Sequence, residues 1–149
     1  LAEEFIEGRE LYVGVMGNDR LQTLPIWELK FTKSNAPLIA THKVKWDRQY
    51  QEKLGVATDL AQDLSADTKK QIERICKRVY KALDLSGYAR MDLRLRNDGR
   101  VFVLEANANP NLSYGEDFAE SAETAGIKYE DLLSKIIGLG LRYRAPWKM

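Results

Sequence analysis

Residues 90–107 read RMDLRLRNDGRVFVLEAN, and they restrict the fold more than any other part of the chain. Apolar and charged residues alternate from 89 to 96, which is the period-2 pattern of a strand with one buried face. An Asp-Gly pair follows, and this pair between two strand-like runs favours a tight hairpin turn, because glycine tolerates a positive φ. The second run is rich in β-branched and aromatic residues. We therefore expect two antiparallel strands.

This hairpin predicts which side chains face each other. If the Asp-Gly pair is the centre of the turn, Asp92 pairs with Glu105 and Arg90 pairs with Asn107, and a symmetric four-residue loop gives the same register. Directly opposed side chains have Cβ atoms about 4.5–5.5 Å apart, and like charges in such a pair destabilise a sheet. Two opposed carboxylates therefore require an explanation.

A divalent cation is one explanation for the opposed acids. Mg²⁺ takes oxygen ligands and is usually held by one or two carboxylates together with substrate phosphates. Asn107 adds a third oxygen on the same face, where Arg90 is suited to hold a phosphate oxygen or a developing anion. The alternative is a solvated strand face on which Arg90 and Arg94 neutralise the acids diagonally. The pairing geometry alone leaves both explanations open.

The composition excludes several classes of protein. The chain has 149 residues, enough for one domain, with 44% apolar and 30% charged residues, as in ordinary soluble domains. A net charge of +1 gives no sign of nucleic-acid or membrane binding. The single cysteine, Cys76, excludes an intrachain disulfide and is compatible with the reducing cytoplasm. No apolar run approaches the ~20 residues of a membrane span.

The N-terminal part of the chain predicts strands. We expect them at residues 2–7, 10–16 and 21–31, the last with a sheet edge or a bulge at Pro25. Residues 32–64 show no clean period, and a long stretch of this kind is typical of a functional loop such as a lid.

The remaining segments predict helices. Ser65 is a suitable N-cap for a helix over 66–84, and Gly87 is suited to end it. Two further helices are expected at about 115–125 and 129–139. The first helix should face the core with a stripe formed by Ile72, Ile75, Cys76, Val79, Ala82 and Leu83. Antiparallel strands with segregated helices predict one α+β domain over 1–149.

Other catalytic chemistry has little support in the sequence. His42 is the only histidine, which excludes most catalytic triads and histidine-rich zinc sites, and we expect it to be structural. Neither of the common glycine-rich phosphate-binding motifs is present. The hairpin therefore remains the strongest candidate for a functional site.

Four segments together resemble a known family. EEFIEGREL at 3–11, KVKW at 43–46, RMD at 90–92 and LEANANP at 104–110 resemble the C-terminal part of an ATP-grasp carboxylate–amine ligase, and look most like the D-alanine–D-alanine ligases. The similarity covers most of the chain in the right order. It implies an antiparallel sheet with packed helices, the C-terminal lobe of the ATP-grasp fold.

The resemblance also implies a magnesium site. Asp92, Glu105 and Asn107 match the ligands of two Mg²⁺ ions, for which Mn²⁺ is an alternative, and Arg90 matches the residue that steadies the transferred phosphoryl group. The implied reaction transfers a phosphoryl group from ATP to a carboxylate, and an amine then attacks the acyl phosphate to form an amide.

The remaining matched positions would bind ATP. Their implied roles are adenine contact by Glu3 and by the backbone around Phe5 and Ile6, ribose binding by Glu10, phosphate binding by Lys45, and packing under the adenine ring by Leu104.

Two departures from the family pattern limit what the resemblance implies about the product and about the activity of this chain. Asn111 follows the loop proline where dipeptide-forming members tend to have glycine, so D-alanyl-D-alanine is not expected as the product; an asparagine can adopt the left-handed conformation there. Complete members also have an N-terminal substrate domain and a central lobe. We therefore expect a C-terminal fragment, inactive alone, whose partner is the missing N-terminal part of the same enzyme.

Alternatives of two kinds stay open. One is another ATP-grasp ligase, which adds amino acids to a peptide or protein end. The other is a non-catalytic module that binds a divalent ion. Small carboxylate and amine substrates and a cytoplasmic location are expected, without nucleic acid or membrane as a partner, and a homodimer is compatible with the resemblance.

Overall fold

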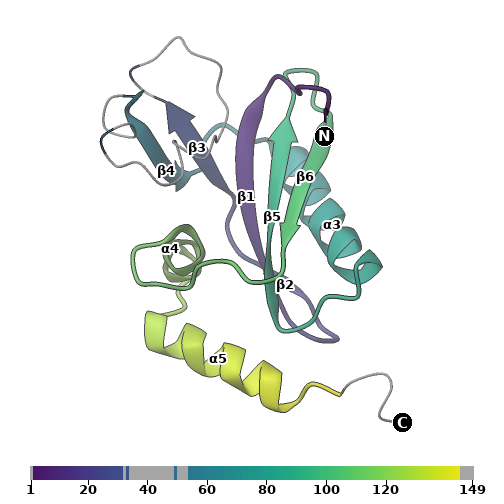
Figure 1. The fold of residues 1–149 in the computed structure, drawn as a ribbon, viewed down its shortest axis with the longest axis vertical. Coiled ribbons are helices and arrows are strands. Elements are labelled where there is room, and N and C mark those ends of the chain that lie inside the picture. The colour runs from purple at the N-terminus through teal and green to yellow at the C-terminus, as the bar shows by residue number, and fades with distance from the viewer. Residues whose placement is uncertain (1, 32, 34–48, 50–53, 145–149) are drawn as a thin grey trace.

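The computed structural model describes residues 2–31, 33, 49 and 54–144, and consists of one antiparallel sheet with helices on both faces (Figure 1). The strand order is β4-β3-β1-β5-β6, and β2 pairs with β1 beside this path. The α+β prediction is confirmed. The strands are β1 (Arg9–Met16), β2 (Gln22–Thr23), β3 (Trp27–Phe31), β4 (Val56–Leu60), β5 (Tyr88–Leu95) and β6 (Val101–Asn107), and the helices are α3 (Ala66–Ala82), α4 (Asp117–Thr124) and α5 (Tyr129–Leu141).

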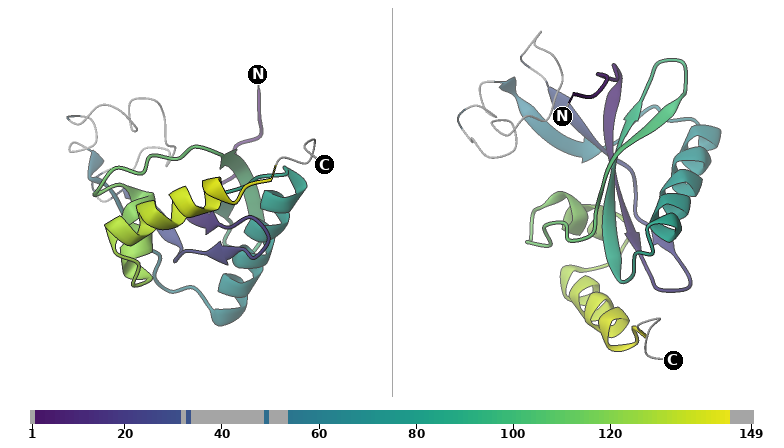
Figure 2. Two further views of the ribbon diagram at one scale, coloured as in Figure 1. Left: turned by 90° about the horizontal axis from the view of Figure 1, so that it is seen from below. Right: turned by 45° about the vertical axis from the view of Figure 1, so that its right-hand side comes forward.

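Helix α3 covers one face of the sheet (Figure 2). Successive side chains of a strand point to opposite faces, so alternate residues of β1 and β5 meet the helix. The helix buries Ile72, Cys76 and Tyr80 against them. The predicted burial of Cys76 is confirmed, and this burial raises the pKa of its thiol to about 12. Cys76 is therefore an apolar core residue rather than a reactive thiol.

The C-terminal end of α3 differs from the predicted stripe. Ala82 and Leu83 were expected to face the core, but both are exposed. Tyr80 is buried instead, and its hydroxyl donates a 2.9 Å hydrogen bond to the carbonyl of Gly17. The helical period is compatible with this, since Ile72, Cys76 and Tyr80 are each four residues apart, and the predicted stripe was centred too far to one side of the helix.

The predicted cap of this helix was also wrong. The left-handed residue that follows the helix is Asp84, with φ 54°, whereas Gly87 lies further along the chain with φ 76°. The amide of Asp84 donates to the carbonyl of Lys81, and the amide of Leu85 donates to that of Tyr80. This is the hydrogen-bond pattern of a Schellman motif, with aspartate where glycine is usual.

The chain enters β1 through a sharp bend, so the strand predicted at 2–7 is wrong. Gly8 has φ 154°, and a Cβ there would lie 2.3 Å from the carbonyl oxygen of Leu95. Residues 2–7, before this bend, form no strand. The strand predicted at 21–31 is likewise two strands, since Pro25 lacks an amide hydrogen and lies in the break between β2 and β3.

Strand β4 was missed in the sequence. Residues 32–64 were expected to lack regular structure, yet 56–60 pair in register with β3. VATDL has only a weak alternation and lies at the sheet edge, half-buried, which explains the weak signal. Most of the preceding segment, with His42 and Lys45, lies outside the described residues.

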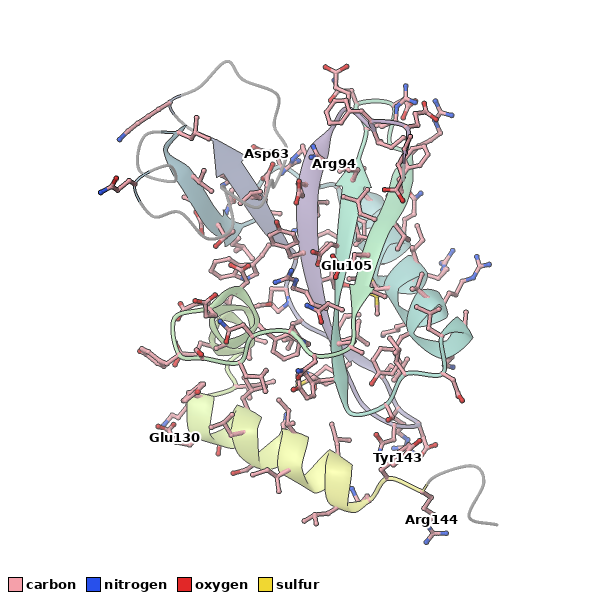
Figure 3. The ribbon with its side chains drawn as sticks, in the orientation of Figure 1. Asp63, Arg94, Glu105, Glu130, Tyr143 and Arg144 are labelled. Atoms are coloured by element: carbon pink, nitrogen blue, oxygen red, sulfur yellow. The ribbon has the colours of Figure 1, made fainter. Side chains whose placement is uncertain are left out.

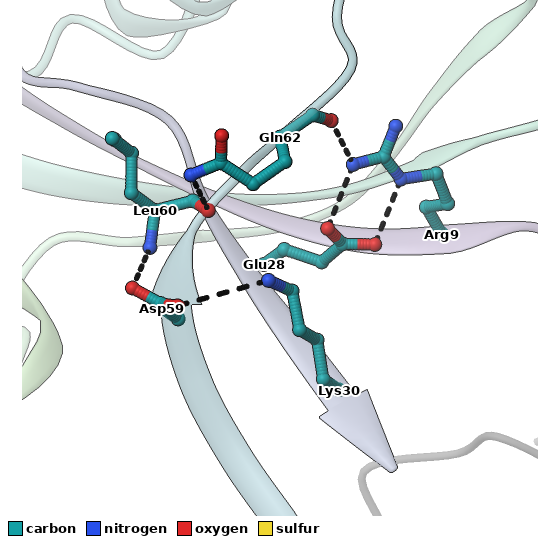
Figure 4. A network of polar contacts seen from close by, with 6 residues as sticks. All are labelled: Arg9, Glu28, Lys30, Asp59, Leu60 and Gln62. Carbon is teal, nitrogen blue, oxygen red and sulfur yellow. Dashed lines mark hydrogen bonds and ion pairs between the residues drawn. The ribbon is translucent and has the colours of Figure 1, made fainter. Parts of the chain in front are cut away.

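A polar network ties β4 and the chain after it to the centre of the sheet (Figure 4). Arg9 of β1 donates two 2.7 Å hydrogen bonds to Glu28 of β3 and a third, also 2.7 Å, to the carbonyl of Gln62. The ammonium group of Lys30 lies 3.8 Å from the carboxylate of Asp59. The network links β1 to β3 and to the chain that follows β4, and it adds an ion pair between β3 and the half-buried edge strand β4.

Helices α4 and α5 cover part of the second face (Figure 2). The helices predicted at 115–125 and 129–139 are thereby confirmed with small changes in their bounds. Gly14 of β1 permits the contact, because a Cβ there would lie 2.7 Å from the side chain of Leu24 and 2.9 Å from the ring of Phe118. Within the described residues, no helix is long and apolar enough to cross a membrane.

We expect Asp84→Gly to raise the free energy of unfolding by about 1 kcal/mol, because it removes the steric cost of a left-handed residue with a Cβ. Urea unfolding monitored by circular dichroism measures the change. Asp84→Ala is the control, since it keeps the Cβ and should give no gain. Equal unfolding midpoints for the two variants would contradict the role assigned to the cap.

Candidate functional site

The β5–β6 hairpin brings four of the predicted residues together. Asp92 is the register partner of Glu105, and Arg90 is the register partner of Asn107. Both predicted pairs are confirmed. Glu105 lies on the hairpin strands above α4 in the view of Figure 3, and Asp117 of α4 lies 3.7 Å from Arg90 on the same face.

The turn of the hairpin is not the one expected. The loop has three residues, 97–99, and it is closed by a 2.9 Å hydrogen bond from the amide of Arg96 to the carbonyl of Arg100. Gly99 has φ 82° and donates its amide to the carbonyl of Arg96 at 3.0 Å. A three-residue loop with glycine in the left-handed position is a common hairpin connection. It shifts the pairing near the turn by one residue.

A β-bulge restores the predicted register. Leu93 pairs with Val103, whereas the neighbouring Asp92 pairs with Glu105, so Leu104 is the extra residue of β6. A bulge adds one residue to one strand and re-aims the side chains beyond it. Without this bulge the odd-length loop would not place the two carboxylates opposite each other.

Arg90 is the centre of the polar face. Its Nε and Nη2 donate hydrogen bonds of 2.7 and 2.9 Å to the two carboxylate oxygens of Asp92. Its guanidinium carbon lies 4.6 Å from the ring centroid of Tyr12, and Nη1 lies 3.7 Å from Asp117 of α4. Asp117 in turn accepts a 2.6 Å hydrogen bond from Thr58 of β4. Residues of β1, β5 and α4 therefore contact this one guanidinium, and β4 reaches it indirectly through Asp117.

A second buried ion pair lies beside it. Nη2 of Arg94 donates to Glu10 at 2.7 Å, and the hydroxyl of Tyr12 donates to the other oxygen of Glu10 at 2.9 Å. Arg94 also donates to the carbonyl of Gly8, and its guanidinium carbon lies 5.6 Å from the ring centroid of Phe5. Burial and the charge of Glu10 raise the pKa of Tyr12 above its usual range, so the phenol remains a donor.

The solvated-face explanation does not match these contacts. Asp92 and Arg94 are each only 4% exposed. Arg90 does neutralise Asp92, but along its own strand, and Arg94 pairs with Glu10 instead of with the acids of the hairpin. The ion pairs are thus buried parts of the structure.

Glu105 and Asn107 complete the set of oxygen donors. Glu105 is exposed and makes no hydrogen bond or ion pair with the described residues, whereas Asn107 accepts a 2.9 Å bond from the amide of Asn109. Within the described part of the chain, no group of three or more His, Cys, Asp or Glu side chains could hold a metal. A cation here would depend on two carboxylates, one amide and the oxygens of a ligand, a donor set that fits Mg²⁺.

The charges of the face favour the same ion. Among the described residues near Arg90 and Arg94 there are four carboxylates, which belong to Glu10, Asp92, Glu105 and Asp117. Two guanidinium groups leave a net negative charge that a divalent cation would neutralise. The residues present therefore fit the metal.

The residues expected at a nucleotide differ in their exposure to solvent. Phe5 is 53% exposed and Leu104 is 49% exposed, so both offer apolar surface. Glu3 is exposed, and Ile6 is half-buried. Glu10 is 7% exposed with both oxygens hydrogen-bonded. These ATP contacts remain predictions.

Sequence reasoning missed three polar residues of the site. Tyr12 could have been predicted from the sequence, because strand alternation places it on the same face as Glu10. Asp117 and Thr58 had no signal, since each comes from a different element whose packing cannot be seen in the sequence.

Comparisons with known proteins agree with this geometry. The family described as D-ala D-ala ligase C-terminus matches residues 1–138. The D-alanine–D-alanine ligase of Desulfotalea psychrophila is 32% identical over 95% of this chain and 42% of its own length. An uncharacterized protein of Sinorhizobium fredii is 31% identical over 95% of this chain and 41% of its own length.

A solved structure supports the same assignment. The D-alanine–D-alanine ligase of Bacillus anthracis, solved in complex with ATP, superposes with a TM-score of 0.73 at 26% identity. The match covers 94% of this chain and 40% of that one. The chain thus spans about two fifths of the length of the relatives it matches.

We expect Arg94→Met to lower the free energy of unfolding by about 3 kcal/mol, because removal of one partner leaves a buried carboxylate unpaired. Adding Glu10→Gln should restore part of the loss, and urea unfolding of both variants measures it. Arg100→Met, which removes an exposed ion pair at the hairpin turn, is the control and should have little effect. An Arg94→Met variant as stable as the control would show that the buried pair is unimportant.

Proposed function

The chain belongs to the D-alanine–D-alanine ligase C-terminal family, and on this premise we propose that it is the Mg²⁺- and ATP-binding part of a ligase that joins a carboxylate to an amine. The observation that carries the proposal is the opposition of Asp92 and Glu105 on a face with excess negative charge. The similarity to a ligase solved with ATP supports it.

The residues of the face have distinct roles in this proposal. Asp92, Glu105 and Asn107 hold the divalent cations, two in number, with Mn²⁺ as a substitute for Mg²⁺. The ions, when bound, neutralise the phosphoryl oxygens and orient the triphosphate. Arg90 steadies the phosphoryl group during transfer, and its rigid fork suits an anionic oxygen.

The nucleotide lies against the exposed apolar residues beside the hairpin. Phe5 and Leu104 offer apolar surface to the adenine, together with Glu3 and the backbone at Ile6. Glu10 accepts the ribose hydroxyls through the lone pairs that its bonds to Tyr12 and Arg94 leave available.

Lys45 reaches the phosphates in this proposal. Its contribution is a single positive charge near the triphosphate, a role that lysine commonly has.

The reaction then has two balanced steps. The γ-phosphoryl group of ATP passes to a carboxylate oxygen, which gives an acyl phosphate and ADP. An amine attacks the acyl carbon, phosphate leaves, and an amide forms with loss of a proton. The chain contributes positioning and charge neutralisation, which dominate phosphoryl transfer.

The substrates depend on parts of the enzyme other than this face. We propose that the chain is a single C-terminal lobe, cytoplasmic, that works with an N-terminal part of the same enzyme, as a monomer or a homodimer, and is inactive alone. Turnover of ATP by the isolated chain with an amino acid would contradict this.

The residue after the loop proline distinguishes this chain from the dipeptide-forming ligases, which tend to have glycine there. Asn111 has no left-handed backbone and accepts a 3.0 Å hydrogen bond from the amide of Ser113. The left-handed conformation that an asparagine can adopt is therefore not used here. A ligase that adds amino acids to a peptide or protein end is the second candidate, and a substrate screen on full-length protein separates the two.

Calorimetric titration with a non-hydrolysable ATP analogue tests the site. Binding to the chain should require Mg²⁺, and Asp92→Asn and Glu105→Gln should each weaken it at least about tenfold, since each removes a charged ligand. Asp98→Asn is the matched control, because it removes an acid from the turn of the same hairpin and should bind normally.

Two results would count against the proposal. Mg²⁺ binding that is indifferent to the nucleotide would favour the non-catalytic module. Equal affinity in the Asp92→Asn and Asp98→Asn variants would show that the hairpin does not hold the metal.

A further inference from the structure

Arg90 lies between two carboxylates that belong to different elements. It is bonded through two nitrogens to Asp92, on its own strand, and its third nitrogen lies 3.7 Å from Asp117 of α4. Asp117 is 21% exposed and is oriented by the 2.6 Å hydrogen bond from Thr58. The guanidinium thus has one occupied carboxylate partner and a second one within reach.

The occupied partner conflicts with metal binding. Both oxygens of Asp92 accept hydrogen bonds from Arg90. Their remaining lone pairs are open to a cation, but a cation bound there would be repelled by the positive charge of the adjacent guanidinium. Arg90 cannot simply lose its partner, because its side chain is 17% exposed and an unpaired buried charge is costly. A nearby second carboxylate removes this difficulty.

We propose that Asp117 is a positioning residue that receives the guanidinium of Arg90 when a divalent cation takes Asp92. The inference rests on the proposed function, which assigns Asp92 to the metal. The centroid of the Tyr12 ring lies 4.6 Å from the guanidinium carbon, and a cation–π contact extends to about 6 Å, so a small shift toward Asp117 would keep this contact. Arg90 then keeps its charge paired beside the bound ion.

A purely structural role for Asp117 is the competing explanation. It lies in the first turn of α4 together with Glu120, where acids interact favourably with the helix dipole, and it links α4 to Thr58. Neither interaction involves Asp92. The two explanations therefore differ in whether Asp117 and Asp92 are energetically coupled.

A metal-free double-mutant cycle measures that coupling. Asp117→Asn keeps the acceptor for Thr58 and removes the charge. It should lower Tm by about 2–4 °C more in the Asp92→Asn background than in the wild type, because Arg90 then has only Asp117 as a charged partner. In the Glu105→Gln background the shift should match the wild type. Equal shifts in all three backgrounds would overturn the proposal.

A Mn²⁺ titration followed by electron paramagnetic resonance, with the ATP analogue present, tests the transfer itself. Asp117→Asn should weaken Mn²⁺ binding about fivefold, since Arg90 then stays on Asp92. Glu120→Gln, which removes the other first-turn acid, and Thr58→Val should each weaken it less. Equal losses in the three variants would overturn the proposal in favour of a structural role.

The two experiments separate this inference from the proposed function. A wild-type chain that binds no Mn²⁺ with the analogue would contradict the proposed metal site, and with it the transfer on metal binding. If the wild type binds Mn²⁺ and Asp117→Asn binds it equally well, only the role of Asp117 fails.

Discussion

The structure depends on the pairing of charges that are buried on one face of the sheet. Asp92, Arg94 and Glu10 are almost fully excluded from solvent, and an unpaired charge in such a place would destabilise the fold strongly. Each of them has a partner at 2.7 Å, Arg90 for Asp92 and Arg94 for Glu10. The exposed Glu105 is the exception among the acids of this face, and it lies where a metal would complete the charge balance.

Hydrophobic packing elsewhere in the fold offsets the free-energy cost of burying charged groups on this face. Helix α3 buries a continuous core against the opposite face, and α4 packs on the same side as the ion pairs through the contact that Gly14 permits. The polar side chains are thus held by elements whose own packing is hydrophobic. Because Arg90 touches β1, β5 and α4, a change in any of these would alter the orientation of its guanidinium.

Similarity and geometry support different parts of the conclusion. The match over residues 1–138 assigns the family, whereas the contacts of Arg90 describe the state of this particular chain. In that state the arginine bonds both oxygens of Asp92, so its positive charge competes with that of an ion for the same carboxylate. Family membership alone would not have indicated this competition.

The sequence by itself determined one strand pair, the hairpin, and the three helices. Alternation and an Asp-Gly turn predicted the opposition of Asp92 and Glu105, although the three-residue loop and the bulge at Leu104 reach that register by a different route. Ser65 was a correct N-cap because its hydroxyl acts on an amide three residues away, a local interaction.

Only the tertiary structure decided which charges neutralise each other. Arg94 pairs with Glu10, 84 residues away, and Asp117 is held by Thr58, 59 residues away. Such partners meet because separate elements pack together, and periodicity within one segment carries no information about that packing. The bend at Gly8 and the edge strand β4 escaped prediction for the same reason, since each is stabilised by contacts with distant strands.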